Sequence, residues 1–327
     1  MLTLLIIKSK SCQKYNLVMK EVISNMKVAL IVINYNTYNL TIKCVDSILN
    51  NCSLDYEIIL VDNKSTNDSY SVLYQKYKDY SKIKVIESPD NRGYSAGLNI
   101  GLDNCVLEEF DYYVFLNNDL LFNKGSLENL VRTFERVDNI GVVGGQIVDL
   151  NLNRQIGYKY LLTFKSHLLS MKPFYYFTKF RKKTDKYNYN NVLVFDGMVA
   201  GCCFAIPRKV MKQLGKFDEE MFIYFEEDAL AHKVHNLGLK CALNPEALIV
   251  HLGSQTISSS AFTYYNRYKS AIYVLAKYCK AKKYQVTIIY WIYKISFLMK
   301  LSQGDSYKEY YLKFCDYYHK MILEVFR

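Results

Sequence analysis

Polar residues follow four apolar runs in the first half of the chain, and their types suit ligand binding. They are Asn34-Tyr35-Asn36, Asp62-Asn63, Asn91-Arg92-Gly93 and Asn117-Asn118-Asp119. If the apolar runs are parallel strands of one open sheet, the carboxyl ends of the strands meet at one edge, where such sheets bind ligands. We therefore expect the four groups to form one continuous floor for a polar ligand.

Asp119 ends the apolar run YYVFLNND at a point where its carboxylate would project from a strand end. A carboxylate in that position can hold Mg²⁺ or Mn²⁺ through oxygen and leave coordination positions open for a diphosphate. Such a metal ion neutralises charge that develops on a leaving nucleotide. Taken alone, however, the Asn-Asn-Asp sequence is more typical of a turn.

Three glycines at a spacing of four, Gly93, Gly97 and Gly101, open the helix that we expect after Asn91. This spacing places them on one helical face. The face would let a phosphate or nucleoside approach the backbone closely, and the helix N-terminus would favour an anion. It would equally let the helix pack tightly on the sheet, and the spacing leaves both interpretations open.

Three acids in a row, Glu226, Glu227 and Asp228, precede a helical pattern that stops at Gly238. A glycine at that point is typical of a helix C-terminus. A carboxylate at the start of a helix can act as a general base toward a hydroxyl group. Acids in the first turn also interact favourably with the helix macrodipole, and we expect one or two of the three to have that role.

These residues need a frame of strands and helices to bring them together. Continuous runs of Val, Ile and Leu occupy 28–35, 56–63, 83–88, 112–119 and 141–149. Helical stretches lie between them near 38–50, 69–80 and 94–108. Such runs are typical of strands buried on both faces, and the alternation predicts an α/β fold with a doubly wound, mostly parallel sheet flanked by helices.

The remaining segments divide the chain into regions. We interpret residues 1–25 as a loose, disordered extension or the product of an upstream start codon, 26–260 as the folded domain and 261–327 as a helical C-terminal region. Within the domain, the Tyr/Lys-rich stretch 151–190 is expected to be an irregular, variable insert. The first 25 residues lack a basic region before their short apolar stretch, so we do not expect a signal peptide.

Composition narrows the class of partner. The chain has 327 residues, with 42 basic and 31 acidic side chains and a net charge of +11. This charge favours an anionic partner such as a nucleotide or phospholipid headgroups. No RNA-binding module or aromatic-basic platform is present in the sequence, so we do not expect nucleic acid. Nine cysteines without a C-x-x-C pair fit a reducing cytoplasm.

The segment 284–301 contains Trp291 and several Ile and Val residues, with lysines at its flanks. It is short for a membrane span and is interrupted by Lys294. An interfacial helix that makes peripheral contact with a membrane fits this pattern. A buried helix that packs on the rest of the domain fits it equally well.

The segments VINYN, VDNKSTND, NRGYSAGLNIG and LNND, in this order, resemble the family 2 inverting glycosyltransferases of GT-A fold, particularly the bacterial rhamnosyltransferase-like branch. The resemblance covers about residues 27–270. It implies metal-assisted transfer of a sugar, with L-rhamnose a candidate, from a dTDP- or UDP-sugar. The acceptor would be a surface polysaccharide or a lipid-linked glycan, and transfer would take place at the inner face of the plasma membrane. It also implies a nucleotide-sugar half over 26–150 and an acceptor half over 151–260. The alternative is a nucleotide-sugar or polyanion binding protein without catalysis.

The same resemblance implies roles for individual residues. The nucleotide would contact Asn34, Asn36, Asp62, Asn63, Arg92, Gly93, Asn117 and Asn118. In this set, Asn34 and Asn36 would line the base pocket and Asp62 would bind the uracil or thymine ring. Asp119 would be the metal ligand of an Asp-X-Asp segment whose first position is Asn117 here, and His251 would lie near the metal and diphosphate.

The resemblance also implies that the base lies in the aromatic segment ending in Glu-Asp, represented here by residues 222–228. Because three acids stand where the family has a Glu-Asp pair, the register has two solutions. Aligning Tyr224-Phe225 and Leu230 selects Glu227, whereas the literal Glu-Asp pair selects Asp228. We favour Glu227 as the catalytic base.

Overall fold

The computed structural model describes residues 26–171, 190–253 and 260–327. The extension expected over residues 1–25 lies outside these ranges, and so does part of the expected insert, 172–189.

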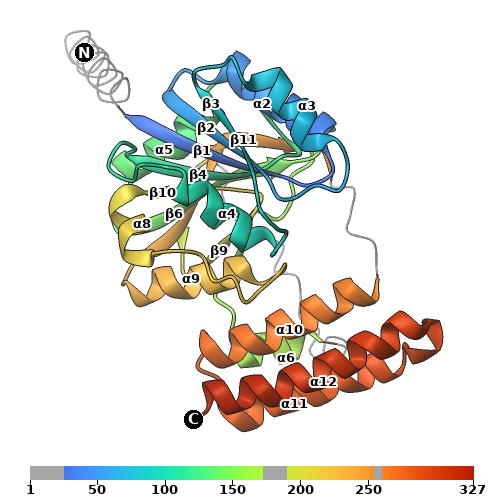
Figure 1. Cartoon of the computed structure of the whole chain (residues 1–327). Coiled ribbons are helices and arrows are strands. Elements are labelled where there is room, and N and C mark those ends of the chain that lie inside the picture. The colour runs from blue at the N-terminus through green and yellow to red at the C-terminus, as the bar shows by residue number, and fades with distance from the viewer. Residues whose placement is uncertain (1–25, 172–189, 254–259) are drawn as a thin grey trace, which may run out of the picture.

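A mixed sheet of nine strands forms the centre of the described structure (Figure 1). The strands are β1 (Lys27–Asn34), β2 (Asp55–Asp62), β3 (Ile83–Glu87), β4 (Tyr112–Asn117), β5 (Leu120–Phe122), β6 (Ile140–Val148), β8 (Leu193–Phe195), β10 (Cys203–Pro207) and β11 (Lys240–His251). Their order is β3-β2-β1-β4-β10-β6-β11-β5, with β8 also paired to β11. β7 (Tyr158–Tyr160) and β9 (Gly197–Val199) form a separate two-stranded sheet.

The first four strands are parallel, as the sequence predicts, and β11 is parallel to β6. β10 runs antiparallel between β4 and β6, and the short β5 pairs antiparallel with the end of β11. The expectation of a mostly parallel α/β sheet is therefore confirmed. Within the centre of the sheet, β10 is the strand that departs from this prediction, because it runs antiparallel to both of its neighbours.

Helices cover both faces of this sheet. One face packs on α2 (Tyr38–Asn51), α3 (Ser69–Tyr77) and α5 (Ser126–Arg136), and the other on α4 (Tyr94–Asp103), α8 (Arg208–Leu214) and α9 (Glu226–Asn236). β1 shows why both faces are apolar: Val28, Leu30 and Val32 belong to the first core, whereas Ala29, Ile31 and Ile33 belong to the second. Successive side chains of a strand point to opposite faces, so a strand buried on both sides must be continuously apolar.

The structure differs from the sequence expectations at one predicted segment and at two helices. The stretch 151–190 is not wholly irregular, since β7 and the helix α6 (Phe164–Ser170) lie within it. The helix α5 was missed although Leu127, Leu130 and Val131 have helical spacing. α8 was also missed; it is a short helix between Pro207 and Gly215.

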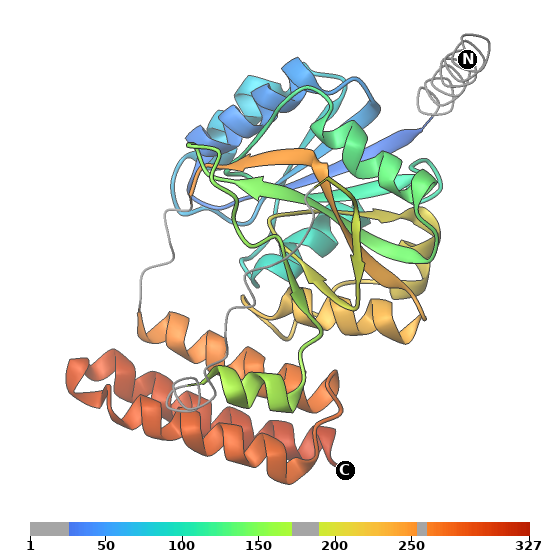
Figure 2. The same cartoon turned by 180° about the vertical axis from the view of Figure 1, so that it is seen from behind.

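The C-terminal region forms a helical bundle, as the sequence predicts. α10 (Ala261–Lys277), α11 (Lys283–Leu298), a 3₁₀ turn (Leu301–Gln303) and α12 (Asp305–Val325) pack together with α6 at one end of the molecule (Figures 1 and 2). Tyrosines carry much of this packing: the rings of Tyr268 and Tyr293 stack with centroids 3.8 Å apart, and those of Tyr290 and Tyr318 with centroids 3.7 Å apart. No helix in the described ranges is long and apolar enough to cross a bilayer.

Asp218 joins the bundle to the sheet domain. Its carboxylate accepts hydrogen bonds from the Tyr273 hydroxyl at 2.8 Å, the Lys277 ammonium at 2.8 Å and the Tyr278 hydroxyl at 2.6 Å. Burial by itself raises the pKa of this carboxyl, but the donors from α10 and the chain after it outweigh burial and lower it to about 2. Hydrogen bonds to the charged form have this effect.

The Asp218 contact predicts a loss of stability when its charge is removed. Asp218→Asn should lower the free energy of unfolding by about 2 kcal/mol at pH 7, because each pKa unit is worth about 1.4 kcal/mol. Since the folded pKa lies below the ordinary 3.8, the wild-type advantage is present above that value and is lost as the pH falls toward the folded pKa. Urea unfolding at pH 7 measures it. Asp79→Asn, which changes an exposed acid just after α3, should leave the midpoint unchanged, and equal midpoints for all three proteins would contradict the prediction.

Candidate active site

A buried polar network ties the tips of β1, β2 and β4 together. The Asn34 amide donates to Asp62 Oδ2 at 2.6 Å, and the Thr41 hydroxyl donates to Asn34 Oδ1 at 2.6 Å. Asn118 donates to Thr41 Oγ1 at 2.7 Å and to Asn34 Oδ1 at 3.2 Å. Asn34 and Asp62 are 0% and 1% exposed. These two side chains therefore support the floor from beneath, and their direct contact with a nucleobase stays a prediction.

Asn36 is the conformationally unusual member of this group, with a φ of 57°. Its backbone N–H donates to Ser65 Oγ at 2.8 Å, and its side-chain oxygen accepts from the Thr66 N–H at 2.8 Å. Ser65 in turn donates to Asp62. The loop after β1 is thereby fixed to the loop after β2, as the two adjoining polar tips lead one to expect.

Above this network lies a cavity of about 450 Å³, here called the first cavity. Four residues expected at the nucleotide line it, namely Asn63, Gly93, Asn117 and Asn118, together with the expected metal ligand Asp119 and the neighbouring Asn91. Aromatic rings close it from several sides, namely Tyr35, Tyr94, Phe222 and Phe262. The sequence analysis assigned these rings no role at the nucleotide; Tyr35 and Tyr94 adjoin two of the polar tips in sequence, whereas Phe222 and Phe262 come from distant segments. The first cavity combines amide groups with flat apolar surfaces, which suits a heteroaromatic ligand.

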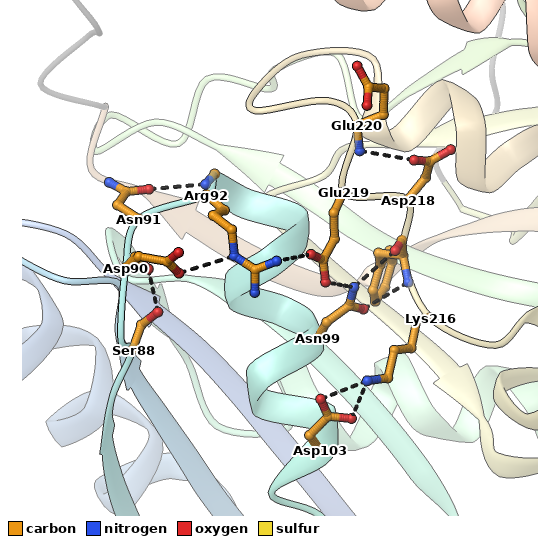
Figure 3. Close-up of polar contacts among 12 residues, drawn as sticks. Ser88, Asp90, Asn91, Arg92, Asn99, Asp103, Lys216, Asp218, Glu219 and Glu220 are labelled. Carbon is orange, nitrogen blue, oxygen red and sulfur yellow. Dashed lines mark hydrogen bonds and ion pairs between the residues drawn. The ribbon is translucent and has the colours of Figure 1, made fainter. Parts of the chain in front are cut away.

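Arg92 makes contacts different from those the sequence suggests. Its guanidinium pairs with Asp90 at 3.1 Å and with Glu219 at 2.7 Å (Figure 3). Asn99 on α4 also holds Glu219 at 2.7 Å and exchanges hydrogen bonds with the backbone of Phe217 (Figure 3). These contacts attach the segment before α9 to α4. A role for Arg92 at the nucleotide stays a prediction, and its observed role is to position that segment.

The three glycines divide between the two interpretations. A Cβ on Gly101 would collide with the side chain of Ile31, and one on Gly97 would lie 3.3 Å from Ile33. Both therefore serve close packing of α4 on β1. Gly93 differs: its φ is 102°, it lines the first cavity, and a Cβ there would meet the Phe222 carbonyl. Only a glycine fits this turn without strain.

Asp119 and His251 come together because β5 pairs antiparallel with the end of β11, where Leu120 lies opposite His251. Their side chains are 9% and 19% exposed, with His251 Nε2 3.1 Å from Asp119 Oδ2. The close contact with the Asp119 carboxylate raises the pKa of His251. The sequence analysis placed both residues at a metal but gave no reason for their direct contact.

Asp119 and His251 fit a divalent cation because one oxygen atom of the Asp119 carboxylate is buried without a partner. Among the described residues, the buried Asp119 Oδ1 has no hydrogen-bond donor. A buried carboxylate oxygen without a partner is costly, and a cation can satisfy it. No group of three or more His, Cys, Asp or Glu side chains with metal-binding geometry occurs in the described part of the chain. Asp119 and His251 therefore suit a hard cation that draws its other ligands from a bound diphosphate.

The three acids at the start of α9 point to different surroundings. Glu227 lines a second cavity of about 330 Å³, which it shares with Asn117 and His251. All three acids line a third cavity of about 660 Å³ that extends toward α6 and α10. Among the three, only Glu227 reaches both cavities. Because Asn117 also lines the first cavity, Glu227 is the acid nearest to the predicted metal and nucleotide residues.

Local structure gives Glu227 this position. Tyr224 and Phe225 have φ values of 72° and 68°, which are unfavourable for aromatic residues. The chain thereby turns sharply into α9. Gly201, after β9, leaves room for the acid, because a Cβ at that position would collide with the Glu227 carboxylate. The sequence analysis missed Gly201 as a site residue, and its place in a run of small residues was the available signal.

Electrostatics favour proton acceptance by this group. Burial raises the pKa of Glu227 above its ordinary value, while a backbone hydrogen bond and the charge of Lys159 oppose that rise. Burial and the Glu227 charge raise the pKa of Asp228 to about 7. A general base works best when its pKa approaches the working pH. Lys159, from β7, lines the second and third cavities and was not foreseen, because its segment was expected to be irregular.

Comparison with known proteins places the chain among glycosyltransferases. An uncharacterized glycosyltransferase of Rickettsia felis is 31% identical over 126 residues, 38% of this chain and 20% of that protein. One from Rickettsia typhi is 27% identical over 204 residues, 62% of this chain and 57% of that protein. The poly(ribitol-phosphate) beta-glucosyltransferase of Bacillus spizizenii is 34% identical over 96 residues, 29% of this chain and 15% of that protein. The chain thus matches less than two thirds of the length of these relatives.

Solved structures share the fold. GalNAc-T7 with UDP, GalNAc and Mn²⁺ superposes with a TM-score of 0.58 at 16% identity, covering 92% of this chain and 57% of the other. The mannosyltransferase PcManGT from Pyrobaculum calidifontis, in complex with GDP-Man and Mn²⁺, has a TM-score of 0.52 at 15% identity, covering 85% of this chain and 76% of the other. At these identities the likeness shows a GT-A-like fold.

The family model named Glycosyl transferase family 2 matches residues 29–215, from β1 to the end of α8. This is more than half of the chain and includes β1, β2, β4 and α4, which position the first cavity. The chain therefore belongs to glycosyl transferase family 2.

Proposed function

We propose that this protein is an inverting glycosyltransferase that moves a sugar from a nucleoside-diphosphate donor to a hydroxyl group of a glycan. The observation that carries the proposal is the place of Glu227, whose carboxylate lines the second cavity with Asn117 and His251. The donor nucleotide would occupy the first cavity, with its base among the aromatic rings and Asn63. The sugar would reach the second cavity past Asn117, and the acceptor would enter from the side of Lys159.

The chemistry is a single displacement. The acceptor oxygen attacks the anomeric carbon while its proton passes to the Glu227 carboxylate. The bond between the anomeric carbon and the diphosphate oxygen breaks, so the nucleoside diphosphate leaves with the bonding electrons and the configuration inverts. Glu227 must be unprotonated at the start, and burial, which raises its pKa, makes the carboxylate a stronger base than an exposed glutamate.

A divalent cation, Mg²⁺ or Mn²⁺, would be held by Asp119 and His251 and would neutralise charge on the diphosphate. Asn117 stands where a second carboxylate would strengthen the site, so cation binding would depend on the diphosphate. The same proposal includes a dTDP- or UDP-linked donor with L-rhamnose as the sugar. The acceptor would be a surface polysaccharide or a lipid-linked glycan at the cytoplasmic side of a membrane. Binding without catalysis is the competing function, and the place of Glu227 beside Asn117 argues against it.

Removing the base should abolish transfer without loss of donor binding. Glu227→Gln should lower kcat by about 10²- to 10⁴-fold, the usual contribution of a general base. Asp228→Asn, the matched control, should change kcat much less because Asp228 does not line the second cavity. Transfer is measured with the donor that stabilises the protein most in a thermal-shift panel of UDP-, dTDP- and GDP-sugars. Full activity in Glu227→Gln would rule out the assignment of the base to Glu227, whatever the activity of Asp228→Asn.

Removing the carboxylate at Asp119 should uncouple the cation from the nucleotide. In the wild type, Mn²⁺ should raise the thermal shift caused by a nucleoside diphosphate, whereas in Asp119→Ala this increase should be absent. Asp79→Asn changes an exposed acid away from the cavities and should behave as wild type. If Asp119→Ala keeps the Mn²⁺-dependent shift and donor hydrolysis, the metal role is wrong.

Lys159 should set the acid limb of the pH profile. Its positive charge lowers the pKa of Glu227, so Lys159→Met should move the fall of kcat/KM at low pH to a higher pH, because the base is protonated earlier. Lys159→Arg keeps the charge and should leave the limb near its wild-type position. Identical limbs in all three proteins would show that Lys159 does not act on the base.

A further inference from the structure

α11 is apolar on two opposite faces. Its inner face is buried in the bundle and consists of Val286, Ile289, Tyr290, Tyr293 and Phe297. Its outer face carries a stripe of exposed large apolar residues, Tyr284, Ile288, Trp291, Ile295 and Leu298, followed by Met299. The spacing of four, three, four and three residues places the stripe along one side of the helix. A helix at the surface of a monomer normally has a polar outer face.

The stripe is well exposed along its whole length. Tyr284 is 59% exposed, Trp291 52%, Ile295 55% and Met299 78%. No described element covers these side chains. α11 and α12 lie at the end of the molecule opposite α2 and α3, outside α10 and α6 (Figures 1 and 2). A continuous apolar surface of this kind marks a contact site rather than scattered surface residues.

Positive charge predominates in the segment that carries the stripe. Between residues 247 and 304 the sequence has no Asp or Glu but eight basic residues. Lys269 and Lys277 pair with Glu220 and Asp218 in the sheet domain. Lys280, Lys282 and Lys283, at the start of α11, are exposed and form no ion pair with a described acid. Lys294 lies 4.6 Å from the centre of the Trp291 ring.

The lysines at the start of α11 are unfavourable for the isolated helix. The N-terminal end of a helix carries a partial positive charge, which anions stabilise and cations destabilise. α11 has no acid in its first turn. An anionic surface near this end would attract both the lysines and the helix dipole. That attraction would offset the repulsion between them.

We propose that the outer face of α11 docks on an anionic phospholipid surface, with the helix axis parallel to the membrane. The stripe would enter the boundary between headgroups and acyl chains, with Trp291 at its centre. Lys282, Lys283 and Lys294 would contact lipid phosphates, their aliphatic stems lying along the apolar face. A second copy of the chain fits less well because it would present the same excess of positive charge. This proposal depends on the surface alone and not on transfer activity.

The single tryptophan of the chain, Trp291, reports directly on this contact. Adding vesicles of phosphatidylcholine and phosphatidylglycerol to the full chain should shift its emission to the blue, whereas phosphatidylcholine alone should cause a much smaller change. High salt should reverse binding, because screening weakens attraction to the charged surface. Co-sedimentation measures the bound fraction under the same conditions.

Variants distinguish the stripe and the lysines from the rest of the surface. Ile288→Ser with Ile295→Ser should weaken vesicle binding at least about tenfold, as expected for two apolar side chains withdrawn from the interface. Lys282→Glu with Lys283→Glu should also weaken it at least about tenfold. Tyr74→Ser with Tyr80→Ser removes exposed tyrosines in and just after α3, at the opposite end of the molecule, and should change nothing.

Two outcomes would overturn the proposal. The first is that the wild-type chain shows neither a blue shift nor co-sedimentation with anionic vesicles. This outcome is measured without any variant, so it does not depend on a variant that folds. The second is a wild-type dimer that the Ile288/Ile295 variant converts to a monomer, with vesicle binding unaffected by the same change. The stripe would then be an interface between copies of the chain.

Discussion

The hydrogen-bond network around Asn34 is the constraint on which the site depends. β1 lies between β2 and β4, and its last residue is opposite Asp62 in the sheet. Because Asn34 and Asp62 are fully buried, their polar atoms must find partners inside the protein, and a lost partner would cost about 1–3 kcal/mol. Thr41 and Asn118 donate to Asn34, whereas Asn34 and Ser65 donate to Asp62. The tips of three strands thereby become one rigid floor.

The floor alone would not make an enzyme, because the acid and the predicted cation ligands come from distant segments. Antiparallel pairing of β5 with β11 brings His251 to Asp119. Arg92, Asn99 and Glu219 attach the segment before α9 to the sheet domain, and Asp218 attaches the same segment to α10. The segment that leads into the unfavourable backbone at Tyr224 and Phe225 is therefore anchored both to the sheet domain and to the C-terminal bundle. We infer that these anchors keep Glu227 at the second cavity.

The sequence predicted the parts of the site that follow from local pattern. Continuous apolar runs predicted parallel strands. Several of the polar residues after them line the first cavity, namely Asn63, Gly93 and Asn117 to Asp119, and their roles there stay predictions. It could not place Asn34 and Asp62 beneath the floor, since strand ends look alike whether they face a ligand or a neighbouring strand. The contact of Asp119 with His251 and the nearness of Lys159 to Glu227 depend on long-range pairing, for which the sequence has no local signal.

The proposed function depends on a single displacement with Glu227 as the base. The most direct test is the anomeric configuration of the first product, followed by NMR during transfer from the donor that the thermal-shift panel selects. A single displacement gives a product whose configuration is opposite to that of the donor. Retained configuration, formed at a rate that Glu227→Gln does not change, would contradict it.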